Sequence, residues 1–225
     1  MKTALIAGPT GLTGKKCLEY LLESGQYSMV TVLTRKKLNI ENKKLVQIIT
    51  DFNDLQESLK QVKVNDVYCC LGTTMKKAGS KEAFFKVDFD YPLQIASFLK
   101  QNGASTFNLV SAIGANKNST IFYSKVKGEI EQALIKLHFP KLNILRPSIL
   151  DGERKESRPG EKAGLILSKI VAPLMIGPLK KYKPVKACAV AFALIYFSIN
   201  APEGVNIIES DKINSIYNKE KYGIN

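Results

Sequence analysis

Ser111, Tyr123 and Lys127 are the side chains whose types and spacing best suit acid/base chemistry. Tyr123 and Lys127 stand four residues apart, so on a helix they share one face and their polar ends converge. A neighbouring ammonium favours the tyrosinate form, which prepares the phenol to give a proton to a developing alkoxide. Ser111 precedes them and can hydrogen-bond the same oxygen. The pattern predicts proton transfer at a carbonyl or alcohol, with the hydride supplied by a cofactor.

Placement separates this tyrosine and lysine pair from two others with the same spacing. The spacing also begins at Tyr182 and at Tyr217, as expected in a lysine-rich chain. Pro184 breaks the helical register of the first, and the second lies in a polar tail. Only Tyr123 opens an amphipathic helix directly after an expected strand at 106–110. Ligands of open parallel sheets bind beyond the carboxyl ends of the strands, so Tyr123 is the candidate that we retain.

A glycine-rich turn at residues 8–14 follows the first expected strand and opens the first expected helix. It has the pattern G-x-x-G-x-x-G. Gly8 allows the tight turn, Gly11 lets the backbone approach a pyrophosphate, and Gly14 lets helix and strand pack closely. Free N–H groups and the dipole at the helix N-terminus favour the anion. The motif predicts a dinucleotide site; the alternative is a purely structural turn.

The end of the second expected strand, at residues 34–37, bears on the choice of nucleotide. Its sequence is Thr-Arg-Lys-Lys, with no acid before Glu41. NAD sites usually have an acid here that binds the ribose 2′-hydroxyl. The Arg35 guanidinium can instead stack on the adenine and bind a 2′-phosphate through two donors. The segment therefore favours NADP(H) over NAD(H), unless Arg35 and its neighbours are solvated surface.

Apolar spacing places these groups on alternating strands and helices within the first 150 residues. Helical periodicity begins at Leu12, Leu55, Ala83 and Tyr123, and Pro92 marks a kink or a helix start. Expected strands cover residues 3–7, 29–33, 45–49, 67–71, 106–110 and 142–145. Helices between the strands make the sheet parallel. The fold class is therefore α/β, a doubly wound parallel sheet in three α/β/α layers.

The alternation ends near residue 150. We therefore expect one domain over residues 1–225, with a cofactor-binding core at 1–150 and a small substrate-side cap at 151–225. Residues 205–208 have the pattern of a last strand, and the polar end, 211–225, is expected to be peripheral.

Two apolar stretches follow a charged loop at 151–162. The first, 163–179, is broken by Lys169 and two prolines, and the second, 187–199, has 13 residues. Because a membrane span needs about 20 residues, neither predicts a transmembrane helix. The first stretch suggests an apolar lid, and hence a small, apolar substrate.

Composition describes an ordinary globular protein, with 45% apolar and 24% charged residues in 225. Disorder, collagen and coiled coil are excluded for the whole chain. The net charge of +13 comes from lysine pairs spread along the sequence. A nucleic-acid site would gather such charge on one face among aromatic residues, so we expect no specific nucleic-acid partner. The charge still attracts anionic ligands, including phosphorylated cofactors.

The cysteine and histidine content predicts no disulfides and no metal site. The four cysteines match neither a disulfide framework nor a zinc spacing, and we interpret them as reduced thiols of a cytoplasmic protein. His138 is the only histidine, which supports neither a metal site nor a Ser-His-Asp triad. Asp88 and Asp90 diverge if both lie on a helix, so we expect no paired carboxylate chemistry from them. The cysteines are Cys17, Cys69, Cys70 and Cys188.

On these motifs, the chain resembles the atypical short-chain dehydrogenases/reductases, and among them the Tat-interacting-protein-like oxidoreductases. The resemblance covers most of residues 1–160 and implies a Rossmann-type domain that binds NADP(H). Met75 stands where relatives have an arginine, so no role of that arginine is transferred. The matching stretches are 8–14, 69–74, 77–79, 87–91, 107–111, 123–129, 146–147 and 156–160.

The resemblance also implies a set of site residues at the ends of the strands. Ser111, Tyr123 and Lys127 form the catalytic set, and Gly14 completes the glycine-rich turn. The implied cofactor contacts are Gly8, Thr10, Gly11 and Leu12 on the pyrophosphate, Arg35 on the 2′-phosphate, Asp51 and Phe52 beside the adenine, Leu71, Gly72 and Thr73 on the ribose side, Lys127 on the nicotinamide ribose, and Pro147, Ser148 and Ile149 near the amide.

These observations favour an NADPH-dependent oxidoreductase that interconverts a carbonyl and an alcohol, with Tyr123 as acid/base. A first alternative is a regulatory or scaffold protein that binds NADPH without turnover. A second is a binder of nucleic acid or anionic membranes that uses the +13 charge, and its binding would weaken steeply with salt. The sequence leaves the substrate, the physiological direction and the oligomeric state open.

Overall fold

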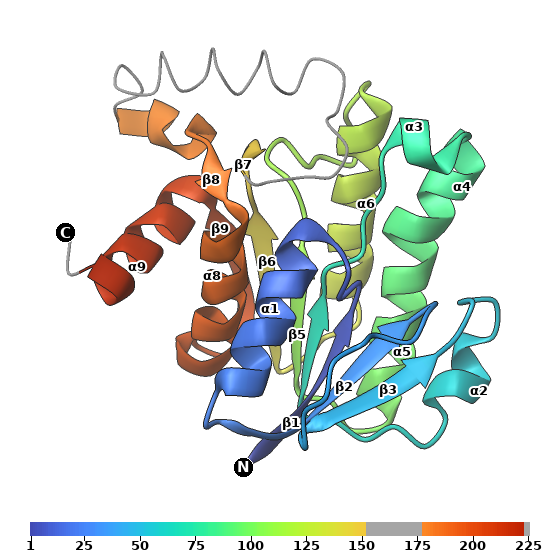
Figure 1. Cartoon of the computed structure of the whole chain (residues 1–225). Helices are drawn as coiled ribbons and strands as arrows, with labels where there is room; N and C mark the ends of the chain where they lie inside the picture. The colour runs from blue at the N-terminus through green and yellow to red at the C-terminus, as the bar shows by residue number, and fades with distance from the viewer. Residues whose placement is uncertain (152–176, 223–225) are drawn as a thin grey trace.

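The computed structural model describes residues 1–151 and 177–222, which form one central sheet between two layers of helices (Figure 1). The seven-stranded sheet has the order β3-β2-β1-β4-β5-β6-β9, and every neighbouring pair is parallel. A separate two-stranded sheet pairs β7 (Leu150–Asp151) with β8 (Val185–Lys186). The strands of the central sheet are β1 (Lys2–Ala7), β2 (Tyr27–Thr34), β3 (Leu45–Ile49), β4 (Asp66–Cys69), β5 (Thr106–Val110), β6 (Lys141–Arg146) and β9 (Gly204–Glu209).

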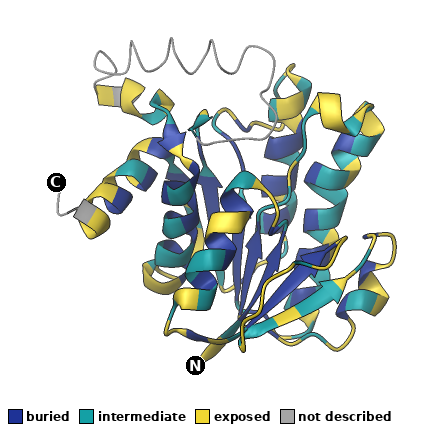
Figure 2. Cartoon of the chain, in the orientation of Figure 1, coloured by how far each residue is buried: buried dark blue, intermediate teal, exposed yellow. Residues whose placement is uncertain are grey.

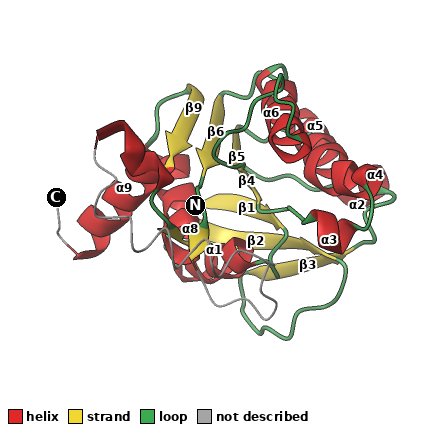
Figure 3. Ribbon diagram, turned by 90° about the horizontal axis from the view of Figure 1, so that it is seen from above, coloured by secondary structure: helices red, strands yellow, loops and turns green. Residues whose placement is uncertain are grey.

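Helices cover both faces of the sheet, which confirms the predicted α/β class (Figure 3). One face packs against α1 (Leu12–Glu23), α8 (Ala187–Asn200) and α9 (Ser210–Tyr222). The other face packs against α2 (Leu55–Leu59), α5 (Tyr91–Gln101) and α6 (Phe122–Ile135). Shorter elements are α3 (Met75–Ala78), α4 (Lys81–Phe85), a π-helical turn (Lys86–Asp90) and a 3₁₀ helix (Gly177–Tyr182).

The two cores follow from the alternation of side chains along the strands. In β1, Ala4 and Ile6 contact the α1 and α8 side, whereas Leu5 and Ala7 contact the α2 and α5 side. All four are fully buried, which accounts for the continuous apolar run of this central strand. Figure 2 shows the central strands mostly in dark blue, as buried residues, between helices of mixed burial. Each fully buried large aliphatic side chain contributes about 1.5–3 kcal/mol of transfer free energy.

The C-terminal segment departs from the expected cap. Strand β9 pairs with β6 at the edge of the central sheet, and α8 packs against α1. Of the described residues after 151, only β8 and the 3₁₀ helix lie outside the central sheet and its helix layers. The apolar stretch at 187–199 is therefore a core helix, apolar on most sides because it packs against the sheet, α1 and α9. The expected loop at 152–162 and most of the expected lid at 163–179 lie outside the described residues.

The prediction that residues 211–225 are peripheral is wrong for the described part of that segment. Helix α9 buries Ile213, Ile216 and Tyr217 against the α8 side of the core. Their spacing is that of one helical face, but the many polar and charged residues of the segment lower its average hydropathy and so conceal this apolar face. None of the helices within residues 1–151 and 177–222 is long and apolar enough to cross a membrane.

Candidate functional site

The site lies where the order of the strands reverses. The chain runs outward from β1 through β2 to β3, then returns to β4 on the other side of β1. Such a switch point leaves a crevice beyond the carboxyl ends of the two central strands. The glycine-rich turn follows β1, and residues 71–73 follow β4, so the two segments border this crevice.

Two of the glycines in the glycine-rich turn have no room for a side chain, whereas the third has space beside it. A Cβ on Gly8, whose φ is +81°, would lie 2.7 Å from the carbonyl oxygen of Cys70. A Cβ on Gly14 would lie 2.0 Å from the carbonyl oxygen of Gly8. A Cβ on Gly11 would meet no atom closer than 3.6 Å, so the packing of the turn does not require this glycine. Its lack of a side chain leaves space before the helix N-terminus.

The N-terminus of α1 suits an anion. No side chain caps its first N–H groups, and no acidic residue lies in its first turn. Thr10 and Gly11 are exposed there, while Leu12 is half-buried. The first turn of α1 thus combines N–H groups without a side-chain cap and the positive end of the helix dipole, which fits a pyrophosphate.

Replacing Gly14 by alanine is expected to destabilise the protein by about 1–3 kcal/mol or more, because the new methyl group overlaps a backbone oxygen that cannot rotate away. The free energy of unfolding in urea measures this. Gly25→Ala is the matched control, since a Cβ there would meet nothing within 4 Å and should leave the stability nearly unchanged. Equal stabilities for the two variants would contradict the close packing of helix and turn.

Lys127 is buried and paired with Asp88. Its side chain projects from α6, the residue is only 4% exposed, and its Nζ lies 2.8 Å from Oδ1 of Asp88. Burial alone would lower the pKa of Lys127, but the charges of Asp88 and Tyr123 outweigh burial and raise it above its ordinary value. Lys127 is therefore an ammonium at neutral pH.

Tyr123 is accessible on the same helix. It lies in the first turn of α6 and is 36% exposed, with its ring against Phe84 at a centroid distance of 5.9 Å. Its electrostatic interaction with Lys127 is among those that raise the lysine pKa. The structure thus brings together an open phenol and a fixed, buried cation, as the spacing of the two residues predicted.

Ser111 has a different partner from the predicted one. Its hydroxyl is buried and donates to the Glu131 carboxylate of α6, which also forms an ion pair with Arg146 at 2.5 Å. A serine has one proton to donate, and here that proton is directed at Glu131. The structure thus gives the hydroxyl a protein partner, and its expected hydrogen bond to a substrate oxygen stays a prediction.

Asp88 is a site residue that sequence reasoning missed. The expectation that Asp88 and Asp90 diverge agrees with their burial, since Asp88 is 1% exposed and Asp90 is partly exposed. Asp88 makes its contact with Lys127 from a π-helical turn, which no local pattern indicated. The one available signal was the position of Asp88 within 87–91, a stretch that carries the family resemblance.

The expected adenine end lies after β2 and β3. Arg35 is exposed and makes no hydrogen bond or ion pair within the described part of the chain. Phe52 is buried against Tyr91, with ring centroids 5.1 Å apart, and has a φ of +70°. A bulky residue in this conformation costs about 1–3 kcal/mol, and such strain concentrates at binding sites. Asp51 is exposed and accepts two hydrogen bonds from Asn53, which lower its pKa.

The other predicted contacts lie beyond β4 and β6. Gly72 lies beside the ion pair, because a Cβ there would be 3.5 Å from Asp88 and 3.9 Å from Lys127. The backbone after β6 is fixed on both sides: Pro147 accepts a hydrogen bond from Ile113, and the Ser148 N–H donates to Ser210. The next side chain, Ile149, is 37% exposed. The remaining two, Leu71 and Thr73, are half-buried.

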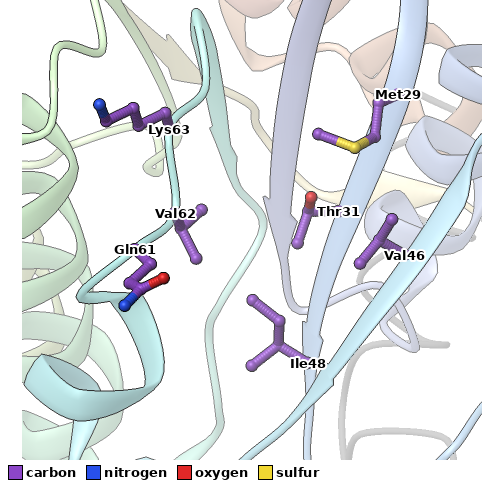
Figure 4. A pocket seen from close by; sticks show the side chains of 7 residues that line it. All are labelled: Met29, Thr31, Val46, Ile48, Gln61, Val62 and Lys63. Atoms are coloured by element: carbon purple, nitrogen blue, oxygen red, sulfur yellow. The ribbon is translucent and has the colours of Figure 1, made fainter.

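A groove of about 290 Å³ lies away from these residues, on the α2 face of the sheet edge (Figure 4). None of the predicted site residues lines it. It is left open because α2 has only five residues and covers little of β2 and β3. Its lining side chains are Met29, Thr31, Val46, Ile48, Gln61, Val62 and Lys63. Within residues 1–151 and 177–222, no group of three or more His, Cys, Asp or Glu side chains is arranged to hold a metal ion.

The comparison with protein families decides the assignment. A family model described as the NAD dependent epimerase/dehydratase family matches residues 4–131, which is more than half of the chain. The chain belongs to this family. Membership confirms the predicted resemblance to short-chain dehydrogenases with a Rossmann-type domain. It also supports a nicotinamide cofactor and oxidoreductase chemistry of that type.

Two relatives agree with this assignment, and one solved structure shares the fold. The chain is 42% identical to Protein HTATIP2 of Rattus norvegicus over 164 residues, which cover 71% of this chain and 67% of the relative. It is 31% identical to Protein FMP52, mitochondrial, of Eremothecium gossypii over 220 residues, covering 96% and 98%. A short chain dehydrogenase family protein from Francisella tularensis has the same fold, with a TM-score of 0.63 and 16% identity over 95% of this chain and 99% of that one.

The names of the fungal relatives overturn the prediction of a cytoplasmic protein. FMP52 of Eremothecium gossypii, Meyerozyma guilliermondii and Saccharomyces cerevisiae is named mitochondrial. The prediction rested on reduced cysteines, and all four cysteines are indeed free. Free thiols, however, fit any reducing compartment, so they could not distinguish the cytoplasm from another one.

Proposed function

We propose that this protein is an NADP(H)-dependent oxidoreductase that interconverts a small carbonyl compound and its alcohol. The observation that carries the proposal is the exposed Tyr123 one helical turn from the buried Lys127 ammonium on α6, with Lys127 close to Gly72, which follows β4. An accessible acid next to a fixed cation is the arrangement that proton transfer to a developing alkoxide requires.

The chain offers groups for each part of a dinucleotide. The open N-terminus of α1 and Gly11 would hold the pyrophosphate, and Arg35 would bind a 2′-phosphate. Residues 71–73 and the fixed backbone at 147–149 would border the nicotinamide end. When bound, the cofactor supplies the hydride in reduction and accepts it in oxidation.

The proton follows a short path in the proposed reduction. As the carbonyl carbon gains the hydride, the phenol of Tyr123 gives its proton to the oxygen and becomes a phenolate. The Lys127 ammonium stabilises that phenolate without transferring a proton, because Asp88 keeps the lysine charged. In oxidation the same phenolate takes the proton back from the alcohol. These steps do not require Ser111, whose hydroxyl donates to Glu131, and its expected bond to the substrate oxygen stays a prediction.

Two features support the finer choices of cofactor and substrate. No acid follows β2 until Glu41, and the exposed Arg35 stands where NAD sites usually have an acid that binds a ribose hydroxyl. This favours NADP(H). The exposed Ile149 after β6 and the apolar character of residues 163–179 favour a small, apolar substrate.

Titration with NADPH and with NADH at two salt concentrations tests the proposal. We expect clear thermal stabilisation by NADPH, about 2.7 kcal/mol at a hundredfold excess over Kd, and a weaker effect of NADH. Stabilisation by NADH alone would contradict the role of Arg35 in binding a 2′-phosphate, but it would be consistent with an NAD(H)-dependent dehydrogenase. No stabilisation by either nucleotide would overturn the proposed function. A panel of aliphatic and aromatic aldehydes and ketones then tests turnover.

A further inference from the structure

The π-helical turn (Lys86–Asp90) is the irregular element next to the site. It joins α4 to α5, which starts with Pro92 in its first turn. A π turn adds one residue to a helical turn, changes the direction of the side chains that follow, and is frequent at functional sites. Here it places Asp88 in the interior and leaves Asp90, two residues on, partly exposed.

Asp88 connects three segments through its two carboxylate oxygens. Oδ1 lies 2.8 Å from Nζ of Lys127 on α6. Oδ2 accepts a hydrogen bond of 2.8 Å from the N–H of Thr73, which follows β4. The loop that borders the crevice, the helix that bears the phenol and the π turn are thus held by one side chain. Asn could accept from Thr73, but it would leave the ammonium without a charge partner.

We propose that Asp88 is a positioning residue that fixes the Lys127 ammonium beside Tyr123 and fastens residues 71–73 to it. Its role in the reaction rests on the proposed function. Its role in holding Lys127 does not, and can be measured in the protein without cofactor.

Asp88 is the one carboxylate that faces Lys127 among the described residues. The other titratable groups near the ammonium are Tyr123 on α6 and Cys69 in β4. Burial raises the pKa of Cys69 to about 12, so this thiol is neutral at physiological pH. A buried ammonium without an anion is strongly disfavoured, and its pKa falls. Removing the charge of Asp88 should therefore change how the protein titrates.

The decisive variant is Asp88→Asn, compared with wild type by urea unfolding from about pH 6 to about pH 10. In wild type the pKa of Lys127 is raised above 10.5, so its contribution is constant below that pH and is lost only as pH rises through the folded-state pKa. In Asp88→Asn we expect the pKa of Lys127 to fall below 10.5. Stability should then increase with pH in that window, about tenfold in the unfolding constant per unit of pKa lowering.

Two controls separate charge from packing. Asp90→Asn changes an acid of the same π turn and should keep the pH profile of wild type. Asp88→Asn/Lys127→Met removes both charges, should lose the pH dependence of the single variant, and should be more stable than it at neutral pH. If Asp88→Asn does not fold but the double variant does, the result supports the proposal that Asp88 compensates the buried charge of Lys127. Failure of both to fold would overturn the pairing role.

Parallel pH profiles for Asp88→Asn and Asp90→Asn would also overturn the inference. The cofactor titration stays independent of this result. A pH-dependent Asp88→Asn variant in a protein that binds neither NADPH nor NADH would keep the positioning role and reject the proposed function. If the protein binds NADPH but Asp88→Asn keeps the pH profile of Asp90→Asn, the proposed function stands and Asp88 is not the residue that holds Lys127.

Discussion

Replacing Tyr123 by phenylalanine is expected to lower kcat for carbonyl reduction by about 10²–10⁴-fold, the usual contribution of a positioned general acid. The change removes only the hydroxyl group. The phenylalanine ring keeps the edge contact with Phe84, and the position is 36% exposed, so folding should be unaffected. NADPH affinity should stay near that of wild type, because the phenol is assigned to the substrate oxygen and not to the cofactor. Rates of NADPH oxidation with an accepted aldehyde measure the effect.

Tyr182→Phe is the matched control for this prediction. Tyr182 has the same spacing to a lysine and is 47% exposed, but it belongs to the 3₁₀ helix and not to α6. It should keep full activity. Full activity in Tyr123→Phe would show that another group protonates the substrate. Normal NADPH binding with no turnover in wild type, over a broad panel of carbonyl compounds, would instead favour the binding protein without catalysis.

Local patterns were sufficient for the sheet and for the glycine-rich turn. The strands at 45–49 and 106–110 have the predicted bounds, because short β-branched and apolar runs bounded by turn residues are a direct sequence signal for strands. The turn at 8–14 was predictable for the same reason, since Gly8 and Gly14 are required by contacts within one strand–turn–helix unit and its neighbouring strand. The pair formed by Tyr123 and Lys127 follows from the geometry of a single helix.

Contacts between distant segments account for what the sequence did not predict. The Ser111 hydroxyl was assigned from its place at the end of β5, but its partner Glu131 lies on α6 and its own partner Arg146 on β6. Asp88 pairs with Lys127 from within a π turn that interrupts the helix. In each case the side chain was visible in the sequence, whereas its partner is set by how α6 packs on the sheet.

Arg35→Glu is expected to reverse the preference between the two nucleotides. A guanidinium on a 2′-phosphate contributes a charge-assisted hydrogen-bond pair, so its replacement by a carboxylate should weaken NADPH binding by about 10- to 100-fold or more. The carboxylate can accept a hydrogen bond from the ribose 2′-hydroxyl of NADH, as acids at this position usually do. NADH affinity should therefore hold or improve. Arg35 is exposed after β2, so the fold should not change.

Lys37→Glu gives the control that makes the Arg35 result interpretable. Lys37 is exposed in the same turn, and its replacement changes the net charge of +13 by the same two units. A cofactor attracted only by the overall positive field would lose affinity equally in both variants, and the loss would shrink with added salt. A contact with the 2′-phosphate predicts a large loss for Arg35→Glu alone, confined to NADPH. Equal losses of NADPH affinity in the two variants would show that the lysine-rich surface as a whole, and not Arg35 alone, favours NADPH.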